Sequence, residues 1–385
     1  MIYLDHAAST PIADSVLQEM MPYLKENYGN PSSIHRYGRI ATKAIESARK
    51  RVANLIGANP NEILFTSGGT ESNNTVLHGI MNQNKGKQLI TSSIEHDAIL
   101  EPCKKLESLG IDVVYLPVDS LGVIDLKKLE SVISDKTALV SIMLANNEFG
   151  TIQPMQEIAK ICKQHSVLLH TDAVQAVGKI QINVKELGVD LMSISSHKIN
   201  GPKGIGALYI RNGIQLDPFI LGGGQENGMR SGTENVANIV GFGKACQVAK
   251  ENLEQNNMAL QTLRNHLIER IMSELSHVSV NGHREQRLPN NAHFTFLGVN
   301  GEDLIIKLDE HGIAASTGSA CSVKTQKASH VLLAMGFSHE QITGSLRLSL
   351  GTSNNVSEID QTVDALKGIV AELRSVSPFK TKYGF

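Results

Sequence analysis

The chain has no tryptophan, and aromatic residues make up only 4% of its 385 positions. Its four cysteines, Cys103, Cys162, Cys246 and Cys321, show no CxxC spacing, which argues against a disulfide framework or a self-contained zinc site. No run of about 18 apolar residues could span a membrane, and the first residues, MIYLDHAAST, lack the basic and apolar segments of a secretory signal. A net charge of −2 gives no basic surface for nucleic acid. We therefore expect a cytoplasmic protein without membrane or nucleic-acid partners.

What is present is an ordinary mixture of 41% hydrophobic and 19% charged residues, over a length that suits two lobes. From about residue 60 to 250, short apolar runs alternate with amphipathic stretches. EILFTS precedes a helical pattern from Glu71, and TALVSIMLANN precedes another at Met155–His165. This alternation predicts an α/β fold with a mostly parallel sheet covered by helices on both faces. Ligands of such sheets bind beyond the carboxyl ends of the strands.

A long helical pattern runs from about Asn235 through Glu274 and is expected to link the lobes. Beyond it, HFTFLG, a helix at Gly301–His311, GIAASTGSACS and SLRLSLG predict a smaller α/β lobe. We expect a large domain at 13–255 and a small domain formed by 1–12 and 256–385.

The sequence SSHK ends at Lys198, between an apolar strand pattern, DLMSI, and the glycine-rich GPKGIG. A lysine at a strand end among small polar residues can form a Schiff base with an aldehyde cofactor. The alternative is a surface lysine, so its interpretation depends on the other motifs.

LFTSGGTESNN places Gly69 and Thr70 between a strand and a helix. Glycine lets the backbone approach an anion, and the helix N-terminus supplies amide donors and a favourable dipole. The segment therefore predicts a phosphate site, although an ordinary capped helix would have the same pattern.

Two further polar residues follow apolar strand patterns. In LLHTDAVQAVG, Asp172 is suited to pair with a protonated ring nitrogen and Gln175 to contact a ring hydroxyl; the alternative for Asp172 is a helix N-cap. In SIEHDAIL, His96 is suited to stack on a flat cofactor and to carry protons near neutral pH, or it is a structural histidine.

Near the C-terminus, STGSACS places Cys321 among small residues, as expected for a nucleophilic thiolate on a loop. The other three cysteines lie in helical patterns and are expected to be inert buried thiols. Arg347 lies in the apolar strand pattern SLRLSLG, where a guanidinium needs an anionic partner. That partner is either a substrate carboxylate or a structural salt bridge.

These residues resemble those of the NifS/IscS cysteine desulfurases, which are class V, fold-type I pyridoxal-phosphate (PLP) enzymes. The similarity runs nearly end to end, in the family's order and spacing. It is carried by YLDHAAST, NPSSIHRYG, SGGTESNN, SIEHDA, ANNEFGTIQP, HTDAVQAVG, SSHKINGPKGIG, GGGQENGMRSGTENV, STGSACS and SLRLSLG. The resemblance implies a fold-type I transferase that converts L-cysteine to L-alanine and leaves a persulfide on Cys321.

The resemblance also implies a role for each matching residue. Lys198 would hold the cofactor and move the Cα proton, His96 would stack on the ring, and Asp172 and Gln175 would contact the ring nitrogen and hydroxyl. Asn147 and Arg347 would bind the substrate carboxylate, with Asn147 also near the cofactor. The phosphate would be held by Gly69, Thr70, Ser195, His197 and, from a second subunit of a homodimer, Thr233.

The family passes its sulfur to other proteins, so the resemblance implies an iron–sulfur scaffold of the IscU/NifU type as acceptor. The long stretch between Cys321 and HVLLAMG is similar to that of the branch with a mobile loop. We hypothesise that Cys321 also serves as a transient iron–sulfur ligand, against the simpler alternative of persulfide transfer alone. The chain departs from the family pattern at Leu221, Asn227 and Asn200.

Two rival functions remain open at this stage. Another class V activity, an aminotransferase or selenocysteine lyase, would not produce alanine steadily from cysteine without a keto acid. A non-catalytic assembly protein with the same fold would lack the yellow colour of bound PLP.

Overall fold

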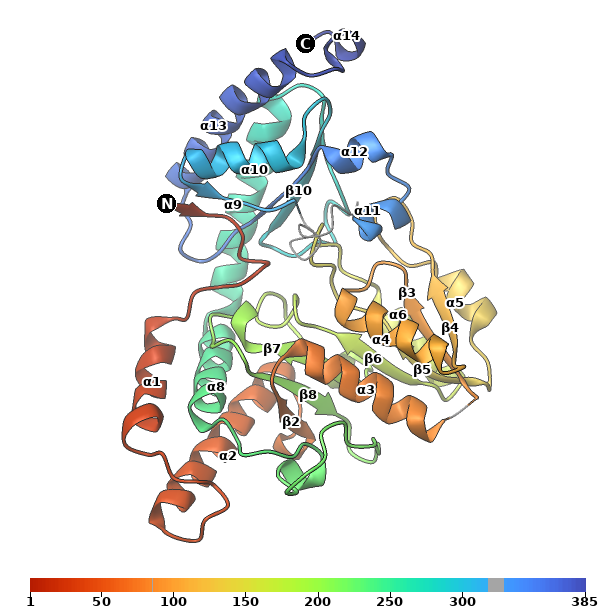
Figure 1. The fold of residues 1–385 in the computed structure, drawn as a ribbon, viewed down its shortest axis with the longest axis vertical. Coiled ribbons are helices and arrows are strands. Elements are labelled where there is room, and N and C mark those ends of the chain that lie inside the picture. The colour runs from red at the N-terminus through yellow and green to blue at the C-terminus, as the bar shows by residue number, and fades with distance from the viewer. Residues whose placement is uncertain (85, 318–328) are drawn as a thin grey trace.

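The computed structural model describes residues 1–84, 86–317 and 329–385. Its centre is a seven-stranded sheet in the order β2-β8-β7-β6-β5-β3-β4 (Figure 1). The strands are, in chain order, β2 (Ile63–Thr66), β3 (Gln88–Ser92), β4 (Asp112–Leu116), β5 (Thr137–Ser141), β6 (Leu168–Asp172), β7 (Leu191–Ser195) and β8 (Gly206–Ile210). β8 runs antiparallel to both of its neighbours, β2 and β7, and the other neighbouring pairs of this sheet are parallel. The predicted α/β fold with a mostly parallel sheet is confirmed.

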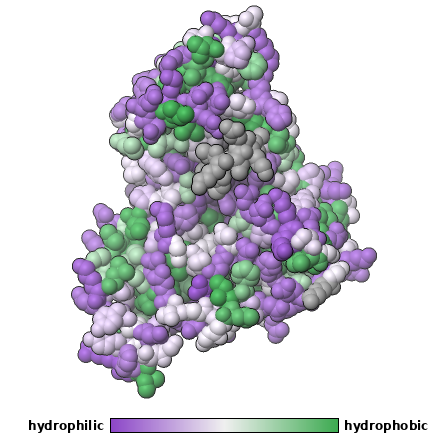
Figure 2. All heavy atoms as spheres, in the orientation of Figure 1, coloured by the Kyte–Doolittle hydropathy of each residue, from purple (hydrophilic) through white to green (hydrophobic). Residues whose placement is uncertain are grey.

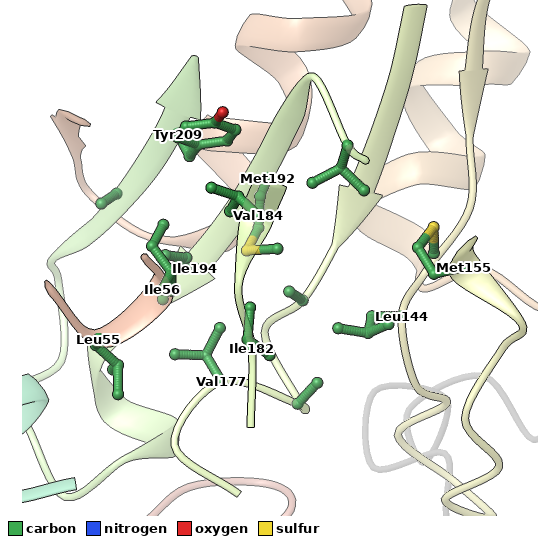
Figure 3. Close-up of a cluster of buried hydrophobic side chains, with 14 of the residues drawn as sticks. Leu55, Ile56, Leu144, Met155, Val177, Ile182, Val184, Met192, Ile194 and Tyr209 are labelled. Carbon is green, nitrogen blue, oxygen red and sulfur yellow. The ribbon is translucent and has the colours of Figure 1, made fainter. Parts of the chain in front are cut away.

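Successive side chains of these strands enter two different hydrophobic layers, as the two-residue period of a strand requires. In β8, Ala207 and Tyr209 belong to one cluster and Leu208 to the other. Figure 3 shows part of the first cluster. The first cluster includes residues of α2 (Arg36–Ile56), α6 (Met155–Gln164) and α8 (Val236–Glu251), and the second includes residues of α3 (Gly69–Gln83) and α4 (Asp97–Ser108). Helices therefore cover both faces of the sheet, and its strand ends are left for a ligand.

A separate hydrophobic cluster unites the N-terminus with the C-terminal third of the chain. It surrounds an antiparallel sheet in the order β12-β10-β9, and Leu4 packs into it. Its strands and main helices are β9 (Val278–Val280), β10 (Asn291–Phe296), β12 (Ser345–Ser349), α9 (Leu253–Glu274), α10 (Gly301–Glu310) and α13 (Val356–Ser375). β1 (Ile2–Tyr3) pairs in parallel with β11 (Ile313–Ala314). This separate core supports the domain division at 13–255, which stays a prediction.

The predicted long helix between the lobes is two helices, α8 and α9. They are separated at Asn252, whose φ of −110° and ψ of 8° are not helical. Its backbone amide and its side-chain amide both donate to the Val248 carbonyl near the end of α8, the latter at 2.8 Å. The remaining helices are α1 (Asp14–Lys25), α5 (Leu126–Val132), α7 (Val184–Leu187), α11 (His330–Ala334), α12 (His339–Thr343) and α14 (Lys380–Tyr383), with 3₁₀ turns at Pro60–Glu62, Ser196–Lys198 and Glu226–Gly228.

On the face shown in Figure 2, hydrophobic residues are interspersed with hydrophilic ones. Within the three described stretches of the chain, no helix combines the length and apolar character needed to cross a bilayer. Many of the apolar side chains are buried in the clusters described above.

Candidate active site

A cavity of about 860 Å³ lies at the carboxyl ends of the parallel strands. Its volume falls within the range of small-molecule sites. It is lined by ten of the predicted site residues, namely Gly69, Thr70, His96, Asn147, Asp172, Gln175, Ser195, His197, Lys198 and Arg347. Thr233 is exposed in the segment before α8, and Cys321 lies outside the described residues.

Lys198 follows β7 and ends a short 3₁₀ turn. Its Nζ atom donates hydrogen bonds to the backbone carbonyls of Ala7, at 2.6 Å, and Ala8, at 2.7 Å. The N-terminal segment therefore holds the amine beside the cavity. Lys198 is not the surface lysine that the sequence left as an alternative.

The expected phosphate end of the cavity is built from two turns. Gly69 and Thr70 begin α3, and a Cβ atom on Gly69 would stand 2.7 Å from Cγ2 of Val174. Glycine therefore allows this turn to pack closely against the one that follows β6. Ser195 and His197 line the same cavity from the end of β7. Burial, with a smaller contribution from Lys198, lowers the pKa of His197 to about 4, which favours the neutral ring near pH 7.

Asp172 ends β6 and is buried, with 7% exposure. Its Oδ2 atom accepts from Asn73 Nδ2 at 2.7 Å, and its Oδ1 accepts from the Val174 amide at 3.0 Å. The chain continues into turns instead of a helix, so the helix N-cap alternative does not apply. Asn73 belongs to SGGTESNN, but sequence reasoning did not single it out as the donor that orients this carboxylate.

Gln175 has its amide orientation fixed by two neighbours. Its Oε1 atom accepts from Lys179 Nζ at 3.3 Å, and its Nε2 atom donates to the Ala7 carbonyl at 2.9 Å. Lys179 also donates to the Gln175 backbone at 3.0 Å. Burial, and then the charges of Lys198 and Arg347, lower the pKa of Lys179 to about 7. The sequence signal for Lys179 was its position directly after HTDAVQAVG.

His96 combines a structural role with a place in the cavity. It is the N-cap of α4, and its Nδ1 atom accepts from the Ala98 amide at 3.0 Å. An accepting Nδ1 requires the hydrogen of a neutral ring to lie on Nε2. The N-cap therefore fixes both the position and the tautomer of this ring.

Arg347 lies on β12, in the antiparallel β12-β10-β9 sheet, and lines the cavity. Its Nη2 atom forms a salt bridge with Asp5 Oδ1 at 2.7 Å, and its Nη1 donates to the Asn147 carbonyl at 3.0 Å. The structural salt bridge that the sequence left open is therefore present. The same guanidinium also borders the space available to a substrate.

Two buried acids that sequence reasoning passed over, Glu95 and Glu148, also line the cavity. Burial raises the pKa of both, that of Glu95 to about 8. Ser329 Oγ donates to Glu148 Oε2 at 2.7 Å. Both acids belong to motifs of the family, SIEHDA and ANNEFGTIQP, so the signal was present in the sequence.

The other three cysteines are buried on helices α4, α6 and α8. Burial raises the pKa of Cys103 and Cys162 to about 12 and also raises that of Cys246. They are inert thiols, as expected. In the described parts of the chain, no group of three or more His, Cys, Asp or Glu side chains is arranged to hold a metal ion.

The three departures from the family pattern do not line the cavity. Asn200 has a φ of 62°, a left-handed conformation that asparagine tolerates, and its Nδ2 atom donates to the Pro11 carbonyl at 3.0 Å. Leu221 is 79% exposed, and Asn227 has a φ of 55° in the same surface segment. None of these residues replaces a group that faces the cavity.

The donors and acceptors of the cavity fit PLP. A glycine-bearing turn at a helix N-terminus suits its phosphate, the buried carboxylate of Asp172 suits a cationic ring nitrogen, and the Lys198 amine suits its aldehyde. Each of these three groups borders the same space.

Comparison with known proteins agrees with this fit. Residues 2–362 match the family model described as aminotransferase class-V. A cysteine desulfurase IscS of Dictyoglomus turgidum is 49% identical over 99% of this chain and 98% of its own length. A solved NifS-like protein matches 96% of this chain and 99% of its own, with 40% identity and a TM-score of 0.91. The structure of SspA in complex with cysteine covers 91% and 99%, with 38% identity and a TM-score of 0.81. The chain therefore belongs to the class V aminotransferase family and, within it, to the PLP-dependent cysteine desulfurases of the NifS/IscS family.

Proposed function

We propose that this enzyme converts L-cysteine to L-alanine, leaves a persulfide on Cys321 and donates the sulfur for iron–sulfur cluster assembly and other sulfur-transfer pathways. The observation that carries the proposal is the convergence of Lys198, Asp172, His96 and Arg347 on one cavity, in a chain of the cysteine desulfurase family. Each of these side chains is also held in place by hydrogen bonds to its neighbours.

Different residues of the cavity would hold different parts of the cofactor. Gly69, Thr70, Ser195 and His197 would hold the phosphate, with help from Thr233 of the partner subunit. Asp172 would pair with the ring nitrogen, because Asn73 and the Val174 amide fix both oxygens of its carboxylate beside the cavity. Gln175 would contact the ring hydroxyl, and His96 would stack on the ring.

When bound, PLP supplies an electron sink that acidifies the α-carbon of the substrate. Arg347 and Asn147 orient the substrate by its carboxylate. The Nζ atom of Lys198 takes the Cα proton and later returns one. Its contacts with the Ala7 and Ala8 carbonyls keep this amine at a fixed place beside the cavity.

In the sulfur-transfer step, Cys321 is the nucleophile, by resemblance to the family. The Cys321 thiolate attacks the substrate sulfur, a sulfur–sulfur bond forms, and the carbon–sulfur bond breaks. The electron pair of that bond stays on carbon, which gains a proton and leaves as alanine. Sulfur is thereby oxidised to the persulfide level and carbon is reduced, so no external oxidant is needed.

The partners follow from the same family membership. We propose a cytoplasmic homodimer, in which the exposed Thr233 reaches the neighbouring site, and an IscU/NifU-like scaffold as sulfur acceptor. A reducing compartment fits the free cysteines Cys103, Cys162 and Cys246. Ligation of a cluster by Cys321 remains a hypothesis beside persulfide transfer.

The test is incubation of the holoenzyme with L-cysteine and no keto acid, with alanine and protein-bound persulfide measured together. Wild type should form both, and Cys321→Ser should form neither, because a hydroxyl is a far weaker nucleophile toward sulfur than a thiolate. Equal alanine production by the two proteins would exclude Cys321 as the nucleophile. Alanine that forms only with an added keto acid would point to an aminotransferase.

A further inference from the structure

Arg347, which is proposed to bind the substrate carboxylate, already holds a carboxylate of its own chain. Its Nη2 atom lies 2.7 Å from Asp5 Oδ1, and the two side chains are 2% and 19% exposed. A buried guanidinium without an anion is unfavourable. Asp5 therefore balances this charge in the absence of substrate.

The Asp5 carboxylate stands on backbone that is fixed to the strand carrying Arg347. Asp5 forms a parallel bridge with Ser349, the His6 amide donates to the Ser349 carbonyl at 3.2 Å, and the Ala7 amide donates to Ser349 Oγ at 2.9 Å. Because Ser349 and Arg347 are two residues apart on β12, the backbones of acid and base are tied together. A substrate carboxylate must therefore share Arg347 with a fixed negative charge.

Two carboxylates that share one guanidinium repel each other. At roughly 5 Å and an effective dielectric constant of about 20, such a repulsion weakens binding by roughly two- to three-hundredfold. Solvent near the partly exposed Asp5 screens it, and we expect about a tenfold effect. The repulsion acts on the carboxylate of the substrate and on that of the product alike.

We propose that Asp5 is a positioning residue that sets the affinity of this site for α-carboxylates. It holds Arg347 in place, and its charge weakens the hold of Arg347 on the carboxylate, so that alanine is released. The inference rests on the proposed function, because it takes Arg347 as the group that binds the substrate carboxylate.

The test compares two ligands that differ only in the carboxylate. L-alanine and L-alaninamide are titrated into the holoenzyme, and binding is followed by the visible absorbance of the cofactor. In Asp5→Asn, the Kd of L-alanine should fall about tenfold, while that of L-alaninamide changes by less than about twofold. KM for L-cysteine should fall without a rise in kcat. Asp5→Glu keeps the charge and should keep the wild-type preference.

Ser349→Ala is the matched control, since it removes the acceptor of the Ala7 amide and leaves the Asp5 charge in place. It should not change the ratio of the two Kd values. A purely structural role of the N-terminal segment would make Ser349→Ala and Asp5→Asn behave alike, which would overturn the inference. An unchanged or raised Kd of L-alanine in Asp5→Asn would overturn it as well.

Arg347→Ala separates this inference from the proposed function. Loss of the preference for L-alanine in Arg347→Ala would support the substrate role of Arg347 whatever Asp5 does. An unchanged preference would refute that role and the inference together. In the Arg347→Ala background, Asp5→Asn should alter the affinity for L-alanine less than it does in the wild-type background, since the guanidinium that draws the two carboxylates together is gone.

Discussion

The buried carboxyl of Glu95, which lines the cavity, should make the stability of the protein depend on pH. Its side chain is fully buried, and its Oε1 atom accepts from Ser92 Oγ at 2.6 Å and from the Met143 amide at 2.9 Å. Burial, with a smaller contribution from the charge of Asp172, raises the pKa of this carboxyl from 4.5 to about 8. At neutral pH the folded protein therefore holds the proton that the unfolded chain releases.

The consequence for stability has a definite sign. Below pH 4.5 both states hold the proton, and Glu95 makes no difference. Between pH 4.5 and pH 8 the folded state binds more protons than the unfolded state. The free energy of unfolding therefore falls by about 1.4 kcal/mol for each unit by which the pH rises. Above pH 8 the loss stays constant, at about 5 kcal/mol. Glu95→Gln cannot ionise and removes this dependence.

The assay is urea unfolding of wild type and Glu95→Gln, both with bound cofactor, at pH 5, 7 and 8.5. The variant should gain stability relative to wild type as pH rises, from below about 1 kcal/mol to about 5 kcal/mol. Other titrating groups cancel in the difference between the two proteins. If the side-chain amide introduced by Glu95→Gln lacks a hydrogen-bond partner, this would cost about 1–3 kcal/mol at every pH. Such a cost shifts the difference in free energy of unfolding between the two proteins without changing its slope against pH.

The exposed Glu130 on α5 provides a control, because Glu130→Gln is the same substitution without burial. A difference between wild type and Glu95→Gln that does not change with pH would mean that the buried carboxyl is ionised. The reasoning from burial would then be wrong.

Three further changes test the site. Lys198→Ala should abolish turnover. Borohydride treatment of wild type followed by mass spectrometry should find the cofactor on the Lys198 peptide. Full activity with an unmodified Lys198 would contradict the role of this residue. Asp172→Asn should slow single-turnover alanine formation by at least about tenfold, because loss of a buried charge pair costs roughly 2–5 kcal/mol, and a near-normal rate would mean that another group protonates the ring. Mixed dimers of Lys198→Ala and Thr233→Ala chains should recover activity, since one of their two sites is intact when Thr233 serves the neighbouring subunit; no recovery after verified subunit exchange would count against a shared site.

The sequence by itself determined the fold class and most of the lining of the site. Alternating strand and helix patterns place polar residues at the ends of parallel strands, and such ends meet at one edge of the sheet. Lys198 and Asp172 were therefore predictable from what precedes them in the chain. The glycine turn at Gly69 was predictable for the same reason, since phosphate binding is local to one strand–helix turn.

Only the tertiary structure decided which distant groups surround these residues. The salt bridge of Asp5 with Arg347 spans 342 positions of the sequence, and the Ala7 carbonyl that holds Lys198 lies 191 positions away. No local pattern encodes such contacts, since they depend on how the N-terminal segment packs against β12 and against the end of β7. The raised pKa of Glu95 is likewise a property of its burial, because an acid in a strand–helix turn has the same sequence signal whether it faces water or the protein interior.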